Sequence, residues 1–459
     1  MEKTTNNEEF SKLNCSSYGL GAFLQQFLRM ALTSLGFYFY EEVLELEPLL
    51  TMTGYIIFCL WNAFNDPLIG FFVNRPFRFT KKWGRFFPWI MIAGIPWLFC
   101  YILIYSPPFS DKLTLFIWLI FTTCLFDTFN SLFFVNFQAL FPTKYQTNKI
   151  RRTASAIVTM LGTVGIAFGA IIPPLFVRKY ETPALFIIQS IVVSIIGGIV
   201  FILGISGWRE KQSTIDDYLE TYEEKKEKSS YSKSFKSALK IRSFFAFLIL
   251  YGFWQVVTYC IQTSVPYVVD QILQKGSIYQ TLLQAAFLIG GLLSIPVWMK
   301  YSHKQNNNKK VMLLGSSFLA IMSITLTFFP NVILLFIQIA IWGIGLGGVW
   351  IMLKPIMADI IDQSVINTEI REEGVYYGIY QFFSRTGWLM QAIIFGVIHM
   401  LTGFAEDPSS PSAQLGIRLH FGLVPTLFLI VGIIIFWKYY TLTPEKVREN
   451  QEILKGLGI

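Results

Sequence analysis

Long apolar stretches separated by short polar connectors dominate this chain. Twelve stretches approach the roughly 20 mainly apolar residues that a spanning helix needs, and they do not alternate with the period of two typical of membrane β-barrel strands. The stretch 280–299 is the weakest, because Gly290, Gly291 and Pro296 interrupt it. We therefore predict an all-α integral membrane protein with twelve transmembrane helices: 18–40, 49–73, 88–105, 113–140, 154–175, 184–205, 243–267, 280–299, 311–329, 332–357, 376–401 and 417–440.

One long hydrophilic segment, residues 206–242, divides the twelve stretches into six and six. We predict an N-terminal six-helix half (1–205), a cytoplasmic linker (206–242) and a C-terminal six-helix half with a cytoplasmic tail (243–459). A weak internal repeat favours two halves. Residues 70–94 and 291–315 each run from a Gly through a basic loop to another Gly. The layout resembles the major facilitator superfamily, whose halves rock about a binding site at the midplane.

Composition agrees with a membrane location. Hydrophobic residues make up 53% of the chain and charged residues only 14%, whereas a soluble domain carries roughly 25% charge. We therefore expect a multi-pass protein of the cell membrane. The first residues are polar and show no cleavable apolar core, so the first helix is expected to direct insertion.

The net charge of +8 is explained by topology. Lys and Arg gather in the connectors 74–87, 141–153 and 300–310, whereas Glu41, Glu42, Glu45 and Glu47 follow the first helix. Because positive connectors face the cytoplasm, we predict that both termini are cytoplasmic. Nucleic acid is not an expected partner.

Ionisable residues at membrane depth are costly and are functional candidates by default. Arg29, Asp127 and Arg385 lie near the middle of predicted helices 1, 4 and 11, and Asp66 lies in helix 2. The alternative is a set of buried ion pairs that only fixes helix register. Both interpretations stay open from these residues alone.

The second helix contains a group of oxygen ligands. Asn62 and Asp66 are four residues apart and share one helix face, Asn65 lies beside them, and Pro67 weakens the local backbone ladder. This pocket suits Na⁺ or a proton. The alternative is a kinked helix whose Asp66 is paired for structural reasons.

Two blocks of sequence resemble a known family. The first runs from Asn65-Asp66-Pro67 through Trp83-Gly84-Arg85 to Pro88-Trp89, and the second from Ala358-Asp359 through Arg371, Glu373-Gly374 and Tyr377-Gly378 to Leu401-Thr402-Gly403-Phe404. The start at 18–23 and Pro425-Thr426-Leu427-Phe428 also fit. The chain is similar to the glycoside–pentoside–hexuronide:cation symporters of the major facilitator superfamily.

That resemblance implies roles for individual positions. Of the two cation-binding aspartates that melibiose-transporting members carry in helix 2, the second corresponds to Asp66 and the first is replaced by Asn62. A third family aspartate falls at Phe134, the threonine of the cation site becomes Ser131, and the lysine of helix 11 becomes Arg385. The resemblance thus implies cation binding by Asp66, Asn62, Asn65 and Ser131, with Arg385 coupling occupancy to closure.

The substrate site departs further from the family. The Lys-Asp pair of helix 1 that meets the sugar becomes Gln25-Gln26, and a helix 5 arginine aligns with Arg151, or equally with Arg152. From the residues themselves we add Arg29 and Asp127, expected to face the central cavity, where Arg29 would hold an anionic group. The predicted substrate-binding residues are Gln25, Gln26, Arg29, Asp127, Asn130 and Arg151.

Other patterns point away from catalysis. The five cysteines are expected to be buried free thiols, and the three histidines, His303, His399 and His420, share no ligand spacing. We predict no metal site beyond Na⁺ at Asp66, no cofactor and no enzymatic activity. The run 343–348 resembles a nucleotide-binding loop, but its apolar surroundings favour close helix packing.

The preferred function is symport of a sugar, glycoside or uronide-like solute with H⁺ or Na⁺ by alternating access, by a monomer in the lipid bilayer. Within transporters, the alternative is a lysolipid symporter of the same family. Outside them, the alternatives are an integral-membrane enzyme, for which no His or Cys cluster is present, and a non-transporting sensor that uses 206–242 as a signalling arm.

Overall fold

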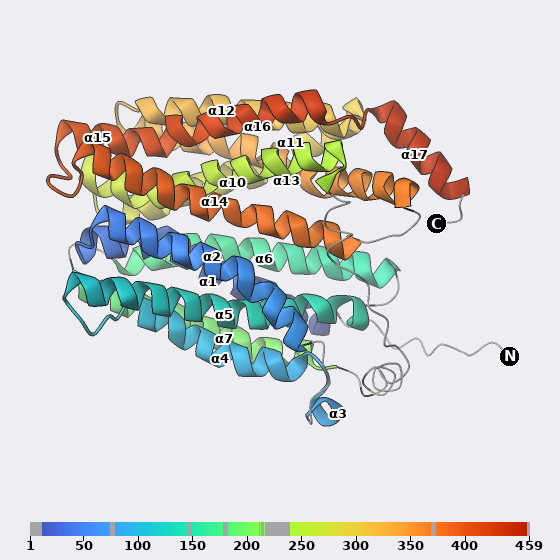
Figure 1. The fold of residues 1–459 in the computed structure, drawn as a ribbon, viewed down its shortest axis with the longest axis horizontal. Helices are drawn as coiled ribbons and strands as arrows, with labels where there is room; N and C mark the ends of the chain where they lie inside the picture. The colour runs from blue at the N-terminus through green and yellow to red at the C-terminus, as the bar shows by residue number, and fades with distance from the viewer. Residues whose placement is uncertain are drawn as a thin grey trace. The chain divides into compact units, whose positions relative to one another are not determined.

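The computed structural model describes residues 12–73, 79–145, 148–177, 182–210, 212, 215, 239–368 and 373–456. Within these ranges all assigned elements are helical (Figure 1), which confirms the all-α prediction. The elements of the first six spans are α1 (Lys12–Tyr38), η1 (Phe39–Val43), α2 (Pro48–Val73), α3 (Thr80–Trp83), α4 (Phe87–Ile104), α5 (Lys112–Lys144), α6 (Asn148–Phe176) and α7 (Pro183–Trp208).

The remaining described elements form the other six spans and the C-terminal tail. They are α10 (Arg242–Tyr267), η2 (Val268–Ile272), α11 (Ile278–Gln305), α12 (Asn308–Thr325), η3 (Leu326–Phe328), α13 (Val332–Thr368), α14 (Glu373–Thr402), α15 (Pro411–Arg418), η4 (Leu419–Leu423), α16 (Val424–Tyr439) and α17 (Pro444–Gly456). The segments η1, η2 and η4 are π-helical, and η3 is a 3₁₀ turn.

Nine helices in the described part of the chain are long and apolar enough to cross a membrane. The three other predicted stretches, 18–40, 49–73 and 376–401, fall on α1, α2 and α14, which are 27, 26 and 30 residues long. Polar residues such as Arg29 and Arg385 interrupt the apolar sequence of two of these helices. All twelve predicted stretches are therefore helical.

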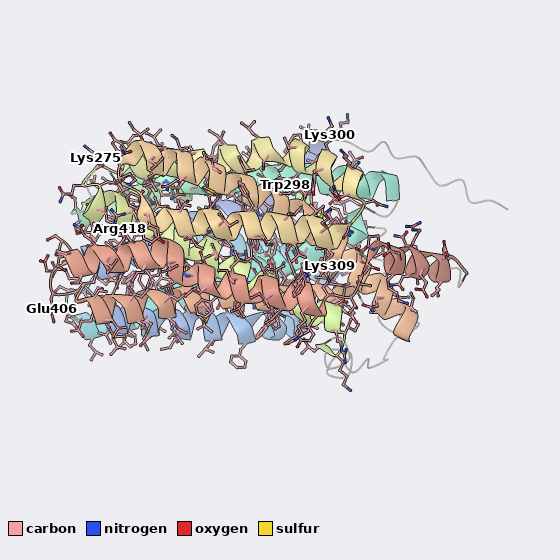
Figure 2. The ribbon with its side chains drawn as sticks, turned by 90° about the horizontal axis from the view of Figure 1, so that it is seen from above. Lys275, Trp298, Lys300, Lys309, Glu406 and Arg418 are labelled. Carbon is pink, nitrogen blue, oxygen red and sulfur yellow. The ribbon has the colours of Figure 1, made fainter. Side chains whose placement is uncertain are left out.

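Glycines on α11 and α13 allow these two helices to pack closely. A Cβ on Gly290 would lie 2.0 Å from the Ala340 carbonyl oxygen, and one on Gly343 would lie 2.3 Å from the Phe287 carbonyl oxygen. These positions let the backbones of α11 and α13 touch, and the indole of Trp298 (Figure 2) donates a hydrogen bond to the Ile344 carbonyl at 2.7 Å. The packing interpretation of 343–348 is confirmed.

Gly343→Ala is therefore expected to lower the thermal stability of the purified protein. The added methyl group would overlap the Phe287 carbonyl, and overpacking of this kind costs about 1–3 kcal/mol. Thermal unfolding in detergent measures the effect. Gly198→Ala is the matched control, because its Cβ would meet only the Leu98 Cδ1 at 3.9 Å. Equal unfolding midpoints for the two variants would contradict the packing argument.

The chain divides into two compact units. The first comprises Met1–Leu32, Leu60–Val177 and Thr182–Glu227, and the second comprises Thr33–Cys59, Arg178–Glu181 and Lys228–Ile459. The division passes through α1 and α2, so residues 33–59 belong to the second unit although the sequence-based halves place them in the first. Residues 206–242 fall largely outside the described residues.

Within the second unit the long helices run side by side (Figure 1). Helix α10 packs against α14 and α16, and α13 packs against α11 and α12. Lys275, Glu406 and Arg418 lie at one end of these helices, and Lys300 and Lys309 lie toward the other (Figure 2).

Candidate functional site

A buried carboxylate on α5 is the centre of a polar group in the first unit. The Asp127 side chain is 3% exposed. The Asn65 Nδ2 donates to its Oδ2 at 3.1 Å, and the Asn62 Nδ2 donates to its Oδ1. Asn62 and Asn65 are three residues apart on α2 and so present both amides on one helix face. Two amides from α2 therefore hold the carboxylate of α5.

Two further side chains complete this group. The guanidinium of Arg29 on α1 attracts the Asp127 carboxylate, and Asn130, one turn further along α5, faces it. Arg29 and Asn130 are both half-buried. We call Arg29, Asn62, Asn65, Asp127 and Asn130 the Asp127 cluster. It joins three helices of the first unit.

Burying this carboxylate requires compensation. A charge near the centre of a spanning helix costs about 2.5–3.5 kcal/mol on insertion scales. A hydrogen bond to a charged group contributes about 1.5–3 kcal/mol, so the two amide donors and Arg29 offset the cost. These interactions compensate the buried charge of Asp127. Both a binding site and a structural ion pair need such compensation.

Two buried acceptors in and beside the Asp127 cluster lack a protein partner. The Oε1 atom of Gln25 and the Oδ1 atom of Asn130 have no hydrogen-bond partner among the described residues. Gln25 lies one turn before Arg29 on α1, so the two side chains share a helix face. Because buried polar atoms in native proteins are normally paired, these acceptors are positions for a donor such as a solute hydroxyl.

The structure groups the predicted residues differently from the sequence. Asn62 and Asn65, predicted cation ligands, donate from their side-chain amides to Asp127, a predicted substrate residue. Ser131 is buried on α5, and Gln26 is half-buried with its side chain near Gly162 of α6. The predicted cation and substrate residues therefore meet at one carboxylate.

Three predicted residues remain untested by this geometry. The side chains of Asp66 on α2 and Arg151 on α6 lie outside the described residues. Arg385 is half-buried on α14 and belongs to the second unit. Their roles in cation binding, substrate binding and coupling stay predictions.

A second buried polar cluster escaped the sequence analysis. Glu41, His399 and His420 are 5%, 0% and 0% exposed, and hydrogen bonds join them in the second unit. Glu41 precedes His399 by 358 positions and the histidines are 21 apart, so no local spacing connects them. The only sequence signal was a carboxylate and two histidines at the ends of apolar stretches.

Metal and thiol chemistry find no support in the described residues. No group of three or more His, Cys, Asp or Glu side chains there is arranged to hold a metal ion. Of the five free cysteines, Cys124 is half-buried and the others are buried. The described thiols therefore behave as small apolar side chains.

Comparison with known proteins gives a consistent class. The family model described as MFS/sugar transport protein matches residues 17–443. The sodium-dependent lysophosphatidylcholine symporter 1-A of Danio rerio is 21% identical over 449 residues, covering 89% of this chain and 82% of that protein. A glucuronide carrier protein homolog of Escherichia coli K12 is 25% identical over 199 residues, covering 42% of this chain and 43% of that protein.

Solved structures agree on the fold. The crystal structure of the nucleoside transporter NupG superimposes with a TM-score of 0.62 at 12% identity, covering 94% of this chain and all of that one. At this identity the likeness concerns the fold alone. It agrees with the all-α membrane fold expected from the apolar pattern.

Proposed function

Because this chain belongs to the MFS/sugar transport protein family, we propose that it is a secondary active transporter that moves a small solute together with a cation by alternating access. Such carriers bind substrate and coupling ion near the bilayer midplane between two repeated halves. The halves proposed here are 1–205 and 243–459, joined by 206–242, with both termini in the cytoplasm. A monomer suffices for this mechanism.

The Asp127 cluster is the observation that carries the proposal. It places a buried carboxylate, a guanidinium and three amides on α1, α2 and α5. Intramembrane ionisable groups of this kind mark solute or ion pathways in transporters. Arg29 supplies a bidentate donor for an anionic group, and Gln25 and Asn130 supply acceptors for hydroxyls.

Cation coupling is assigned to Asp66, with help from Ser131. Asn62 and Asn65 link this position to the Asp127 cluster, since both lie on α2 and bond to Asp127. Arg385 on α14 is proposed to couple cation occupancy to closure by competing for the Asp66 carboxylate. The sodium dependence in the names of the lysophosphatidylcholine symporters supports Na⁺, whereas a lone helix 2 aspartate suits H⁺.

Two substrate classes fit the same side chains. A sugar acid or glycoside has hydroxyls and, in uronides, a carboxylate, and the family description and the glucuronide carrier homolog support this class. A lysolipid has a phosphate and a glycerol hydroxyl, and the match to lysophosphatidylcholine symporters over 89% of the chain supports it. We keep the sugar-type solute as the first candidate and the lysolipid as the second.

A competition assay in proteoliposomes separates the two classes. Purified protein is reconstituted, and uptake of a labelled uronide and of a labelled lysophosphatidylcholine is measured with an imposed Na⁺ or H⁺ gradient. We expect one class of solute to accumulate in the liposomes. The other class is expected to compete only weakly for its uptake, although the polar head of either must fill the same cluster. Protein-free liposomes are the control. The absence of gradient-driven flux for both classes would contradict symport of these solutes.

A further inference from the structure

The second polar cluster forms a continuous hydrogen-bonded chain. The Nδ1 atom of His399 lies 2.9 Å from both carboxylate oxygens of Glu41, and its Nε2 lies 3.1 Å from the Nε2 of His420. The Nδ1 of His420 lies 2.7 Å from the Ser264 hydroxyl, which donates to the Cys260 carbonyl at 2.6 Å. The Tyr267 hydroxyl donates to Glu41. All these residues belong to the second unit.

Counting hydrogens along this chain shows that it needs one more than the neutral side chains supply. The four contacts Glu41–His399, His399–His420, His420–Ser264 and Ser264–Cys260 each require one hydrogen between their atoms. Each neutral imidazole brings one N–H and the Ser264 hydroxyl brings one O–H, which makes three. An ionised Glu41 brings none, so one contact would join two lone pairs.

One additional proton completes the chain. Placed on His399 it gives an imidazolium facing the Glu41 carboxylate, and placed on Glu41 it gives a carboxylic acid donating to a neutral His399. Either way the three titratable groups carry no net charge. Without this proton they carry a net charge of −1 inside the protein, where an unsatisfied polar group is costly.

Backbone geometry singles out the same place. The three π-helical segments among the described residues border this cluster: Glu41 lies in η1, η2 begins directly after Tyr267, and His420 lies in η4. A π-helical turn widens the helix and redirects a side chain, and such turns are frequent at functional sites. Three of them around one buried cluster argue against incidental contact.

Aromatic rings close the cluster off from solvent. The His420 ring stacks on Phe395 and the His399 ring stacks on Phe404, each at a centroid distance of 4.0 Å. The ring of Tyr267 packs edge-on against both imidazoles. In this dry setting, gain or loss of one proton changes the local energy far more than it does at a surface.

The neighbouring charges favour keeping the proton. Asp270 in η2 accepts hydrogen bonds from Tyr38 at 2.6 Å and Gln271 at 2.8 Å, and Gln271 also donates to Glu42 at 2.9 Å. Desolvation, followed by the negative charges of Glu41 and Asp270, raises the pKa of Glu42 to about 8. The cluster thus borders two further carboxyl groups.

The cations nearby do not neutralise it. Arg418 donates to the Phe329 carbonyl at 3.0 Å and lies over the Phe329 ring, and Lys275 is exposed at the same end (Figure 2). Glu406, from the loop after α14, is exposed as well. Among the described side chains, the ion-pair partner of Glu41 is His399.

We propose that Glu41, His399 and His420 form a proton-binding site that holds one exchangeable proton, and that this proton stabilises the packing of residues 33–59 on the second unit. The site lies outside the residues assigned to transport above and goes beyond that function. Segment 33–59 is also held by Ser34, which accepts from Gln280 and Gln284 at 3.0 and 2.9 Å. Loss of the proton would leave a buried negative charge beneath this segment.

The sign of the pH dependence follows from linkage. The folded protein binds this proton more tightly than the unfolded chain does, so its stabilising contribution is present at low pH and disappears as pH rises through the pH at which the site releases it. The contribution of Glu42 has the same sign, because its pKa is raised.

Histidine NMR tests the proposal directly. The chain has three histidines, so ¹⁵N-histidine labelling of the intact protein in nanodiscs gives three sets of signals. The His399 and His420 signals are expected to change together as the pH rises, because the two imidazoles share one hydrogen-bonded proton.

Two variants change the hydrogen count without emptying the site. Glu41→Gln supplies an amide N–H to His399 and still accepts from Tyr267, so the chain is complete without the extra proton. Ser264→Ala removes two of the four contacts and one hydrogen, so the two imidazole N–H groups suffice for the two contacts that remain. We expect both variants to lose this joint change of the His399 and His420 signals, with Glu406→Gln and Ser190→Ala as matched controls that keep it.

A stability readout accompanies the spectra. The thermal stability of the wild type is expected to fall as pH rises from about 6 to about 9. Glu41→Gln is expected to reduce this slope and to leave the part that Glu42 contributes. Hydrogen-exchange protection of 33–59, measured relative to the base-catalysed intrinsic rate at each pH, is expected to fall over the same range in the wild type and to change less in Glu41→Gln. Histidine titration curves that are the same in wild type, Glu41→Gln and Ser264→Ala would overturn the proposal, even if one variant were destabilised.

Discussion

Charge reversal of Asp127 to Lys is expected to abolish solute uptake. The lysine would face Arg29 and the amide donors of Asn62 and Asn65, leaving a buried cluster of donors with no acceptor charge. Breaking a buried, hydrogen-bonded charge pair costs about 2–5 kcal/mol, which corresponds to a loss of about 30-fold to several thousand-fold. Initial uptake rates in proteoliposomes, normalised to inserted protein, measure the effect.

A paired variant separates substrate binding from a structural ion pair. Exchanging the two charges, with Arg29→Asp and Asp127→Arg in one protein, restores an attraction between α1 and α5. If the pair only fixes helix register, uptake returns. We expect it to stay lost, because a substrate group held by Arg29 would meet a carboxylate. Asp111→Asn is the control, since exposed Asp111 caps α5 by accepting from the Thr114 amide at 2.9 Å, and asparagine also caps helices.

Asp66→Asn is expected to abolish uphill accumulation while leaving exchange of solute across the membrane. The amide keeps the shape of the carboxylate but neither binds a proton nor supplies charge to a cation. Without the coupling ion the carrier equilibrates solute but does not concentrate it. Accumulation ratios under separate Na⁺ and pH gradients, together with counterflow rates, measure the change.

The same assay identifies the coupling ion. Wild-type accumulation that follows the Na⁺ gradient alone assigns Na⁺, and accumulation that follows the pH gradient alone assigns H⁺. Asp407→Asn, in the exposed loop after α14, is the control with an unchanged ratio. Full accumulation by the Asp66→Asn variant would remove this residue from the coupling mechanism.

The individual polar residues show how far a sequence reaches. Arg29 and Asp127 stood out because a charge inside a 20-residue apolar stretch is conspicuous and expensive. Their association, and the contact of Asn62 and Asn65 with Asp127, depend on how α2 is rotated against α5. Spacing along one helix carries no information about that rotation.

The twelve helical stretches and the all-α class followed from the sequence by itself, because a backbone in lipid must satisfy its hydrogen bonds within each segment. The glycines of α11 and α13 were also interpretable, since an absent side chain invites a close backbone. The link between Glu41, His399 and His420 was decided only by the tertiary structure. Each of these residues ends a different apolar stretch, and packing of those helix ends brings a carboxylate and two imidazoles into one dry, hydrogen-bonded chain.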